Sequence, residues 1–200
     1  MGQKIGMRKN VAILVFDDVE VLDFAGPFEV FAVTDELRSR EAFNVYTVAP
    51  ASGVVRARNG LRVAPDCTPG DCPPPHILIV PGGLGTRILL GNGVLLEWIR
   101  ANSRAAEVTM SVCTGALLLG KAGLLEGLRV TTHHGALDLL REVAPKAIVD
   151  PGARFHDNGS IITSAGVSAG IDSSLHLVGR LLGEPAAAAT ASQMEYERRH

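Results

Sequence analysis

The sequence predicts an α/β fold in which helices cover both faces of a mostly parallel β-sheet. Short β-branched and apolar runs, typical of strands buried on both sides, alternate with segments of helical periodicity. Hydrophobic residues make up 46% of the 200 residues, which is enough for one large core. Because we find no repeat and no linker-like segment, we expect residues 1–200 to form a single domain.

The first half of the chain supplies three predicted strands, two helices and a hairpin. Pro27 suits the first position of a helix, because the N–H that proline lacks is not needed there. Asn59 and Gly60 form a pair typical of the tight turn of a hairpin. The predicted elements are a strand at 11–16, a helix at 26–37, a strand at 43–50, a hairpin at 53–66, a strand at 76–83 that ends in a Pro-Gly-Gly loop, and a helix at 93–104.

The second half continues the same alternation. The predicted elements are strands at 107–113, 129–133, 147–150 and 160–166, and helices at 114–125, 135–145, 170–183 and 185–199. In open parallel sheets, ligands bind beyond the carboxyl ends of the strands. The loops that we expect near a site therefore follow Phe16, Val80, Val112, Thr132 and Thr163.

Charge and cysteine content exclude several classes of protein. The formal net charge of −2 gives no support for a nucleic-acid partner. No apolar run reaches the ~18 residues of a membrane span, and the run at 11–16 is too short for a secretory signal. The cysteines, Cys67, Cys72 and Cys113, are odd in number and lack framework spacing, which indicates a reducing compartment. We therefore expect a cytoplasmic protein that binds neither membranes nor nucleic acid.

Cys113 stands where a predicted strand passes into a helix, in "SVCTGALLLG". A nucleophile on such a turn is exposed above the sheet, and the small residues after it, Thr114 and Gly115, allow a tight turn. The free N–H groups at the helix start would stabilise a thiolate, lower its pKa and form an oxyanion hole. The alternative is a buried structural thiol, which is common for free cysteine.

Gly82 and Gly83 follow another strand, in "VPGGLGT". Paired glycines permit unusual backbone angles and expose N–H groups, so Gly83 is a candidate second oxyanion donor. The segment is no phosphate-binding loop, because it lacks the Lys-Ser/Thr ending. An ordinary turn remains the alternative.

Asp23 lies in the predicted loop after the first strand, among the apolar residues of "VLDFAG". Apolar surroundings favour the neutral form of a carboxyl group, and such an acid can exchange a proton with Cys113. The alternative is a helix cap for the helix that starts near Pro27, a role that aspartate often has.

His133 and His134 stand at the end of the strand at 129–133. Either histidine is a candidate to orient or deprotonate Cys113, and the alternative is a hydrogen-bonded structural residue. The chain has neither an H-x-x-x-H pattern nor a CxxC pattern, so we expect no metal site. The small-residue segment at 162–172 suits either close backbone packing or ligand contact.

At these residues the chain resembles the ThiJ/PfpI superfamily, the class I glutamine-amidotransferase-like proteins. This resemblance implies a flavodoxin-like sandwich, a homodimer, and Cys113 as the nucleophile at a strained elbow. It runs nearly end to end, through "VAILVFDDVEVLDFAGPFEV", "IVPGG", "SVCTGALLLGKAGLLEGLRVTTHH" and "SAGVSAGID".

Within the superfamily, the pattern is most similar to that of the isocyanide hydratases. The resemblance implies that Cys113 attacks the terminal carbon of an isocyanide and that Asp23 protonates that carbon, then activates water against the thioimidate. It also places Gly83 and Thr114 beside the anion site. The implied protein acts on a small-molecule substrate and needs no metal or organic cofactor.

Other branches of the superfamily match less well. The peptidase branch has a histidine directly after the nucleophile, where this chain has Thr114, and the late His-x-Glu pair of glutamine amidotransferases is missing. The glyoxalase and deglycase branch has a glutamate where this chain has Asp23, but His133 lies where that branch often has its histidine. A glyoxalase-type activity on 2-oxoaldehydes is therefore an alternative.

A non-catalytic function is the third alternative. Similar domains form the N-terminal half of AraC-type transcription regulators, where they sense ligands. We expect this chain, at 200 residues, to lack the helix-turn-helix domain that follows in those regulators. A stand-alone ligand sensor, or a redox sensor that uses oxidation of Cys113, remains open.

Overall fold

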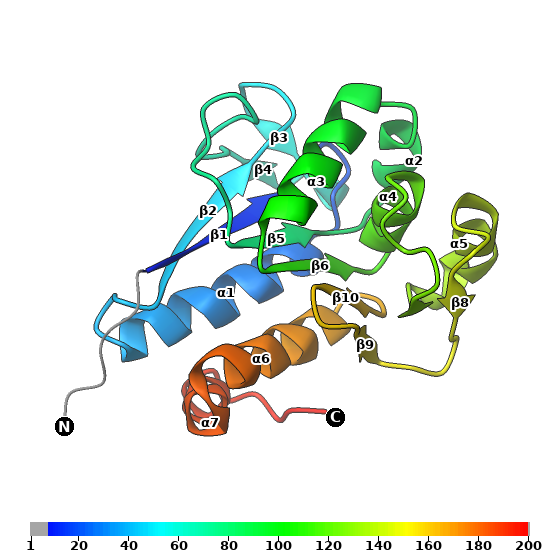
Figure 1. Ribbon diagram of the computed structural model, residues 1–200. Coiled ribbons are helices and arrows are strands. Elements are labelled where there is room, and N and C mark those ends of the chain that lie inside the picture. Colours follow the sequence, from blue (N-terminus) through cyan, green and yellow to red (C-terminus); the bar gives the residue numbers. More distant parts are fainter. Residues whose placement is uncertain (1–7, 200) are drawn as a thin grey trace.

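A computed structural model describes residues 8–199 and confirms the predicted α/β fold class (Figure 1). The central sheet has six strands in the order β2-β1-β5-β6-β10-β9, all parallel except β9, which runs antiparallel to β10. The strands are β1 (Lys9–Leu14), β2 (Phe43–Val48), β5 (Ile77–Val80), β6 (Val108–Val112), β9 (Phe155–Asp157) and β10 (Ile161–Ser164). The predicted domain also includes residues 1–7 and 200, which lie outside the described part.

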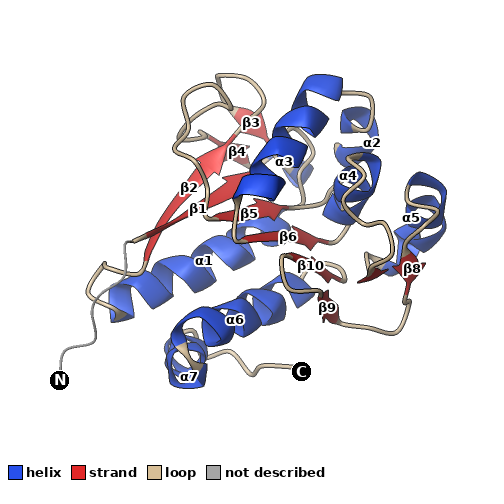
Figure 2. Cartoon of the chain, in the orientation of Figure 1, coloured by secondary structure: helices blue, strands red, loops and turns tan. Residues whose placement is uncertain are grey.

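Helices cover both faces of this sheet (Figure 2). One face carries α1 (Val21–Leu37), α6 (Ala169–Leu182) and α7 (Glu184–Gln193), and the other carries α2 (Thr86–Leu89), α3 (Gly93–Ala105) and α4 (Gly115–Lys121). The helix α5 (Leu137–Val143) packs beside α4. No helix between residues 8 and 199 is both long and apolar enough to cross a membrane.

Two short ribbons lie outside the main sheet. The predicted hairpin is present: β3 (Val55–Arg56) pairs antiparallel with β4 (Arg62–Val63), and Asn59 and Gly60 adopt positive φ angles of 62° and 93° in its turn. The strands β7 (Arg129–Val130) and β8 (Ile148–Val149) form a separate parallel pair. Short 3₁₀ turns, η1 (Arg58–Gly60) and η2 (His134–Ala136), complete the described elements.

The core lies on both sides of the central strands. All residues of β5 and β6 are buried, as predicted for strands covered on both faces. The helices α1 and α6 approach closely at Gly26, where an added Cβ would lie 3.0 Å from Cγ1 of Ile171. This close packing brings the N-terminal ends of α1 and α6 to the carboxyl edge of the sheet.

The prediction that the first helix begins near Pro27 is wrong. The helix α1 begins at Val21, and Pro27 lies inside it. A proline in a helix costs one backbone hydrogen bond, here the bond to the carbonyl of Asp23, and packing of the helix against the sheet compensates for that loss. Sequence reasoning also missed β9 and α2, whose three and four residues are too short to show a period.

Candidate active site

Cys113 occupies a strained elbow between β6 and α4. Its φ is 55°, in the left-handed region that residues with a side chain rarely adopt, at a cost of about 1–3 kcal/mol. Its N–H donates to the carbonyls of Ser164 (3.2 Å) and Ala165 (3.1 Å), and the Thr132 hydroxyl donates to its carbonyl at 2.7 Å. Gly115 is required after the elbow, because a Cβ there would lie 1.9 Å from the Val80 carbonyl oxygen. The tertiary structure therefore holds the elbow from several sides.

Asp23 lies in the first turn of α1 with its side chain fully buried. Its Oδ2 accepts the N–H of Gly82 at 3.0 Å, and its Oδ1 has no hydrogen-bond partner among the described residues. Burial raises the pKa of Asp23 to about 7, and the Gly82 amide and the Cys113 side chain oppose that rise. The carboxyl group is therefore neither in a loop nor a helix cap, but it can exchange a proton near neutral pH.

The expected lowering of the Cys113 pKa is wrong for this structure. Burial above all, and then the charge of Asp23, raise the pKa of the thiol to about 12. The backbone N–H groups of Thr114 and Val167 lower the pKa by less. Because the thiol is only 6% exposed, little water is available to stabilise a thiolate. Cys113 therefore keeps its proton at neutral pH, and Asp23 is the nearby group able to accept it.

Gly82 and Gly83, in the loop between β5 and α2, donate hydrogen bonds to the side chains of Asp23 and Thr114. Gly82 has no room for a side chain, since a Cβ would lie 2.4 Å from the Thr114 nitrogen and 2.9 Å from Oδ2 of Asp23. The N–H of Gly83 donates to Oγ1 of Thr114 at 2.9 Å. That hydroxyl donates in turn to the Gly83 carbonyl at 3.1 Å. Both glycine N–H groups are thus engaged by the site itself, and their proposed oxyanion role stays a prediction.

His133 and His134 lie at the edge of the site. Nδ1 of His133 accepts the N–H of Gly135 at 3.1 Å, which places the proton of the neutral ring on Nε2. Burial, and then the charge of His134, lower the pKa of His133, so the ring is neutral at pH 7. The His133 ring also fills the space beside Gly166, where an added Cβ would lie 2.4 Å from its Cδ2. No hydrogen bond in residues 8–199 joins either histidine to Cys113 or Asp23.

Val167 contributes to the site in a way that sequence reasoning missed. It lies in the turn between β10 and α6, and its N–H lowers the pKa of both Asp23 and Cys113. Its φ is 52°, an unusual value for a β-branched residue. The run of small residues at 162–172 drew attention to this turn, but a backbone N–H leaves no signature in residue type.

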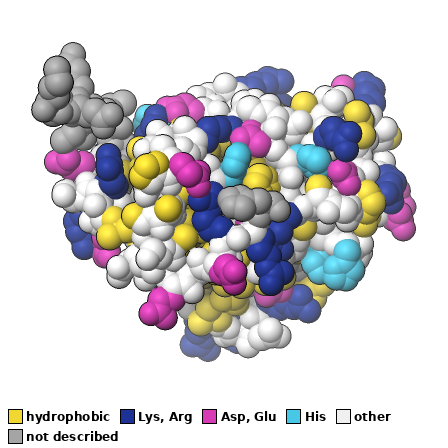
Figure 3. All heavy atoms as spheres, turned by 90° about the horizontal axis from the view of Figure 1, so that it is seen from below, with side chains coloured by type: hydrophobic (Ala, Val, Ile, Leu, Met, Phe, Trp, Pro, Cys, Tyr) yellow, Lys and Arg dark blue, Asp and Glu magenta, His cyan; other side chains and the backbone are white. Residues whose placement is uncertain are grey.

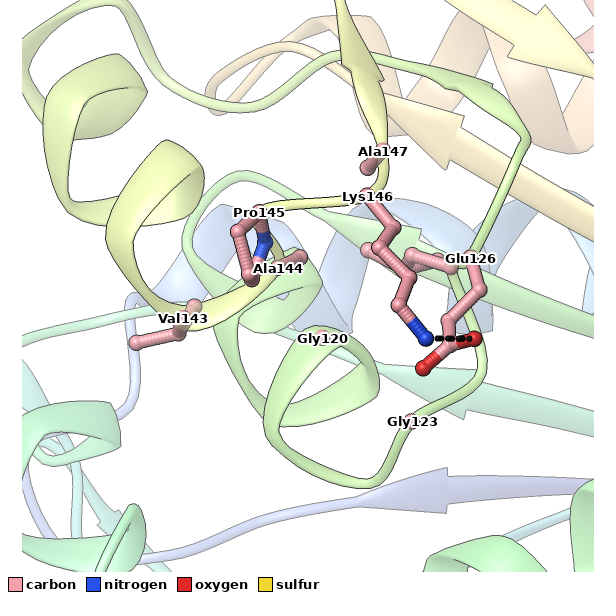
Figure 4. A pocket seen from close by; sticks show the side chains of 9 residues that line it. Gly120, Gly123, Glu126, Val143, Ala144, Pro145, Lys146 and Ala147 are labelled. Carbon is pink, nitrogen blue, oxygen red and sulfur yellow. Dashed lines mark hydrogen bonds and ion pairs between the residues drawn. The ribbon is translucent and has the colours of Figure 1, made fainter.

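Within the described residues, the pair of Asp23 and Cys113 coincides neither with a possible metal site nor with the cavity lined by Gly120 and Val143–Ala147. Within residues 8–199, no group of three or more His, Cys, Asp or Glu side chains is placed to hold a metal ion. A small cavity lies between the end of α4 and the segment Val143–Ala147, with the ion pair of Lys146 and Glu126 beside it (Figure 4). Its lining includes no candidate catalytic residue.

A cysteine on a strand-to-helix elbow of a doubly covered parallel sheet, facing a buried acid, defines a class of α/β proteins that carry a nucleophile elbow. Residues 9–180 match the DJ-1/PfpI family, and the chain belongs to that family. It is 35% identical over 190 residues to isonitrile hydratase of Pseudomonas putida, covering 95% of this chain and 79% of that protein.

Two further relatives show the range of this similarity. A crystal structure of a ThiJ/PfpI family protein from Pseudomonas syringae superposes with a TM-score of 0.86 at 31% identity, covering 96% of this chain and 77% of that one. The HTH-type transcriptional regulator GbdR of Pseudomonas aeruginosa is 28% identical over 193 residues, which cover 95% of this chain. This chain spans only 51% of the length of that regulator.

Proposed function

We propose that this protein is a cofactor-independent cysteine enzyme that adds water to an isocyanide and produces an N-substituted formamide. The observation that carries the proposal is the buried pair of Asp23 and Cys113, in which the carboxyl has a pKa of about 7 and the thiol is protonated. Such a pair can pass one proton back and forth without a metal. The 35% identity to an isonitrile hydratase supports the same substrate class, since isonitrile and isocyanide are one functional group.

The first half of the proposed reaction forms a covalent thioimidate. The sulfur of Cys113 attacks the terminal carbon of R–N≡C while the Asp23 carboxylate accepts the thiol proton. Asp23 then gives that proton to the same carbon, which has gained an electron pair. The sum of these steps adds the S–H bond across the carbon and leaves R–N=CH–S–Cys113, with Asp23 again ionised.

The second half releases the formamide by hydrolysis. Asp23 takes a proton from water as the hydroxide oxygen bonds to the thioimidate carbon, and it then gives this proton to the nitrogen. Asp23 then takes the hydroxyl proton of the tetrahedral intermediate R–NH–CH(OH)–S–Cys113 as the C–S bond breaks, which releases R–NH–CHO. The departing sulfur takes the proton held by Asp23, so the thiol and the carboxylate are both regenerated and the net reaction consumes one water.

A direct assay of formamide formation tests this proposal. An alkyl isocyanide is incubated with the wild-type protein and with Cys113→Ala, and the formamide is measured by mass spectrometry. Cys67→Ser is a matched control, because Cys67 lies in the loop after β4, away from the elbow. Formamide from the wild type and the control, but not from Cys113→Ala, is the expected result. Equal turnover by Cys113→Ala would overturn the mechanism.

A ligand sensor is the second candidate function. It is favoured by the similarity to the regulator GbdR and by a resting cysteine whose pKa is about 12. A sensor binds its ligand without turnover, so the isocyanide would raise the thermal midpoint of Cys113→Ala as much as that of the wild type while no formamide appears. Turnover with multiple product molecules per protein would contradict this candidate.

A further inference from the structure

The turn at Gly166–Ser168 joins β10 to α6 and lies directly against the elbow. The residue before it, Ala165, accepts the N–H of Cys113 on its carbonyl at 3.1 Å, and Val167 at its centre has a φ of 52°. A β-branched residue is strained in the left-handed region, so the surrounding structure must hold it there. We therefore expect contacts from outside the active site to keep Val167 in this conformation.

Arg154 provides contacts on both sides of this turn. Its carbonyl accepts the N–H of Ala165 at 2.9 Å, just before the turn. Its guanidinium donates to Oγ of Ser168 at 3.2 Å, just after Val167, and its Nε donates to Oδ2 of Asp172 at 2.5 Å in the first turn of α6. The backbone of Arg154 thus contacts the residue before the turn, and its side chain connects the end of the turn to the first turn of α6.

The partner of Arg154 has little freedom to move. The Asp172 side chain is fully buried, and its Oδ1 accepts the N–H of Arg199 at 2.9 Å. The Tyr196 phenol lies beside the pair, and burial and then the Asp172 charge raise its pKa. A buried carboxylate without its cation costs several kcal/mol, so the pair resists separation. Figure 3 shows the face that carries α6 and α7, where basic side chains gather near the centre with acidic ones among them.

We propose that Arg154 is a positioning residue, whose ion pair with Asp172 and hydrogen bond to Ser168 hold the Gly166–Ser168 turn against Cys113. Its effect on turnover depends on the proposed hydratase function. Its effect on the reactivity of the Cys113 thiol does not depend on that function.

The test measures Cys113 alkylation and formamide formation on the full chain. Cys67→Ser and Cys72→Ser are introduced first, so that Cys113 is the one thiol that iodoacetamide can modify. In this background, Arg154→Met with Asp172→Leu removes the ion pair without leaving a buried charge. Arg180→Met is the control, because Arg180 pairs with Asp157 near the end of the same helix.

Displacing the Val167 N–H, which lowers the pKa of the Cys113 thiol, should raise that pKa and slow alkylation at pH 8.5 about tenfold. The double variant should also lower kcat more than it changes KM. Arg180→Met should leave the alkylation rate and the kinetic constants unchanged. Arg154→Lys, which keeps the charge but cannot contact both Ser168 and Asp172 in a fork, should recover part of the rate. It replaces the double variant in both assays if that variant does not fold.

An unchanged alkylation rate in the folded double variant, or in Arg154→Lys where the double variant does not fold, would overturn the positioning role. If the wild type produces no formamide, the hydratase function fails. The alkylation comparison would still decide the role of Arg154.

Discussion

The N–H of Gly82 donates to Oδ2 of Asp23 at 3.0 Å, and no side chain fits between them. This contact joins the loop after β5 to the first turn of α1, two segments 59 residues apart in the sequence. It fixes one carboxyl oxygen and leaves the other, Oδ1, buried without a hydrogen-bond partner among the described residues. We expect this unpaired oxygen to be the one that exchanges a proton with Cys113.

Gly82→Ala should damage both stability and activity. The added Cβ would lie 2.4 Å from the Thr114 nitrogen, so the elbow or the loop must shift. We expect a loss of about 1–3 kcal/mol in the free energy of unfolding and a strong loss of turnover. Urea denaturation and the formamide assay measure the two effects. Gly93→Ala, where an added Cβ contacts nothing within 4 Å, is the matched control. Equal stability of both variants would contradict the packing argument.

The rate should depend on the ionisation of Asp23. Because the proposed mechanism requires the carboxylate to accept the thiol proton, kcat/KM should rise with pH through an apparent pKa near 7. Asp23→Asn should lower kcat/KM by about 10²-fold or more and remove that rise. A pH profile of formamide formation from pH 5 to pH 9 measures both effects. A rise near pH 7 that persists in Asp23→Asn would assign it to another group.

Asp23→Asn should also stabilise the fold at alkaline pH. The folded-state pKa of Asp23 is raised from 3.8 to about 7, so the native state binds more protons than the unfolded state between these values. Stability contributed by this group is therefore lost as the pH rises from about 4 to about 7. Asp23→Asn should raise the thermal midpoint at pH 8 and change it less at pH 5, as measured by calorimetry. A larger gain at pH 5 would contradict the assigned shift.

Neutralising Asp23 should also make Cys113 more reactive. The Asp23 charge raises the pKa of the thiol, so Asp23→Asn should speed alkylation by iodoacetamide at pH 8.5 while it slows turnover. The measurement uses the Cys67→Ser and Cys72→Ser background, with Asp138→Asn as a control at an exposed carboxylate on α5. Slower alkylation in Asp23→Asn would show that the carboxylate activates the thiol even in the resting site.

His133→Ala separates the hydratase from the glyoxalase alternative. A glyoxalase that uses His133 as acid or base should lose about 10²–10⁴-fold in converting methylglyoxal to lactate. A hydratase should lose little, because no hydrogen bond in the described structure joins His133 to Cys113 or Asp23. Formamide and lactate are measured on one preparation of each protein, with His134→Ala as the control at the exposed neighbour. A collapse of formamide formation in His133→Ala would bring this histidine into the mechanism.

Local patterns were enough to predict much of the fold and one catalytic candidate. The apolar runs at 11–16 and 76–83 predicted buried strands, and Asn59 with Gly60 predicted a hairpin turn. The position of Cys113 between a strand and a helix predicted the elbow, and its φ of 55° agrees with that prediction. These features depend on residue types within a few positions of one another, and the sequence states those directly.

Only the tertiary structure decided the chemistry of the site. It placed Asp23 in a helix instead of a loop, and it engaged the Gly83 N–H with Thr114. It also raised the pKa of Cys113, against expectation, and brought the N–H of Val167 to the pair. Proton affinity depends on burial and on nearby charges and N–H groups. Here these come from segments far apart along the chain, and only long-range packing sets their distances.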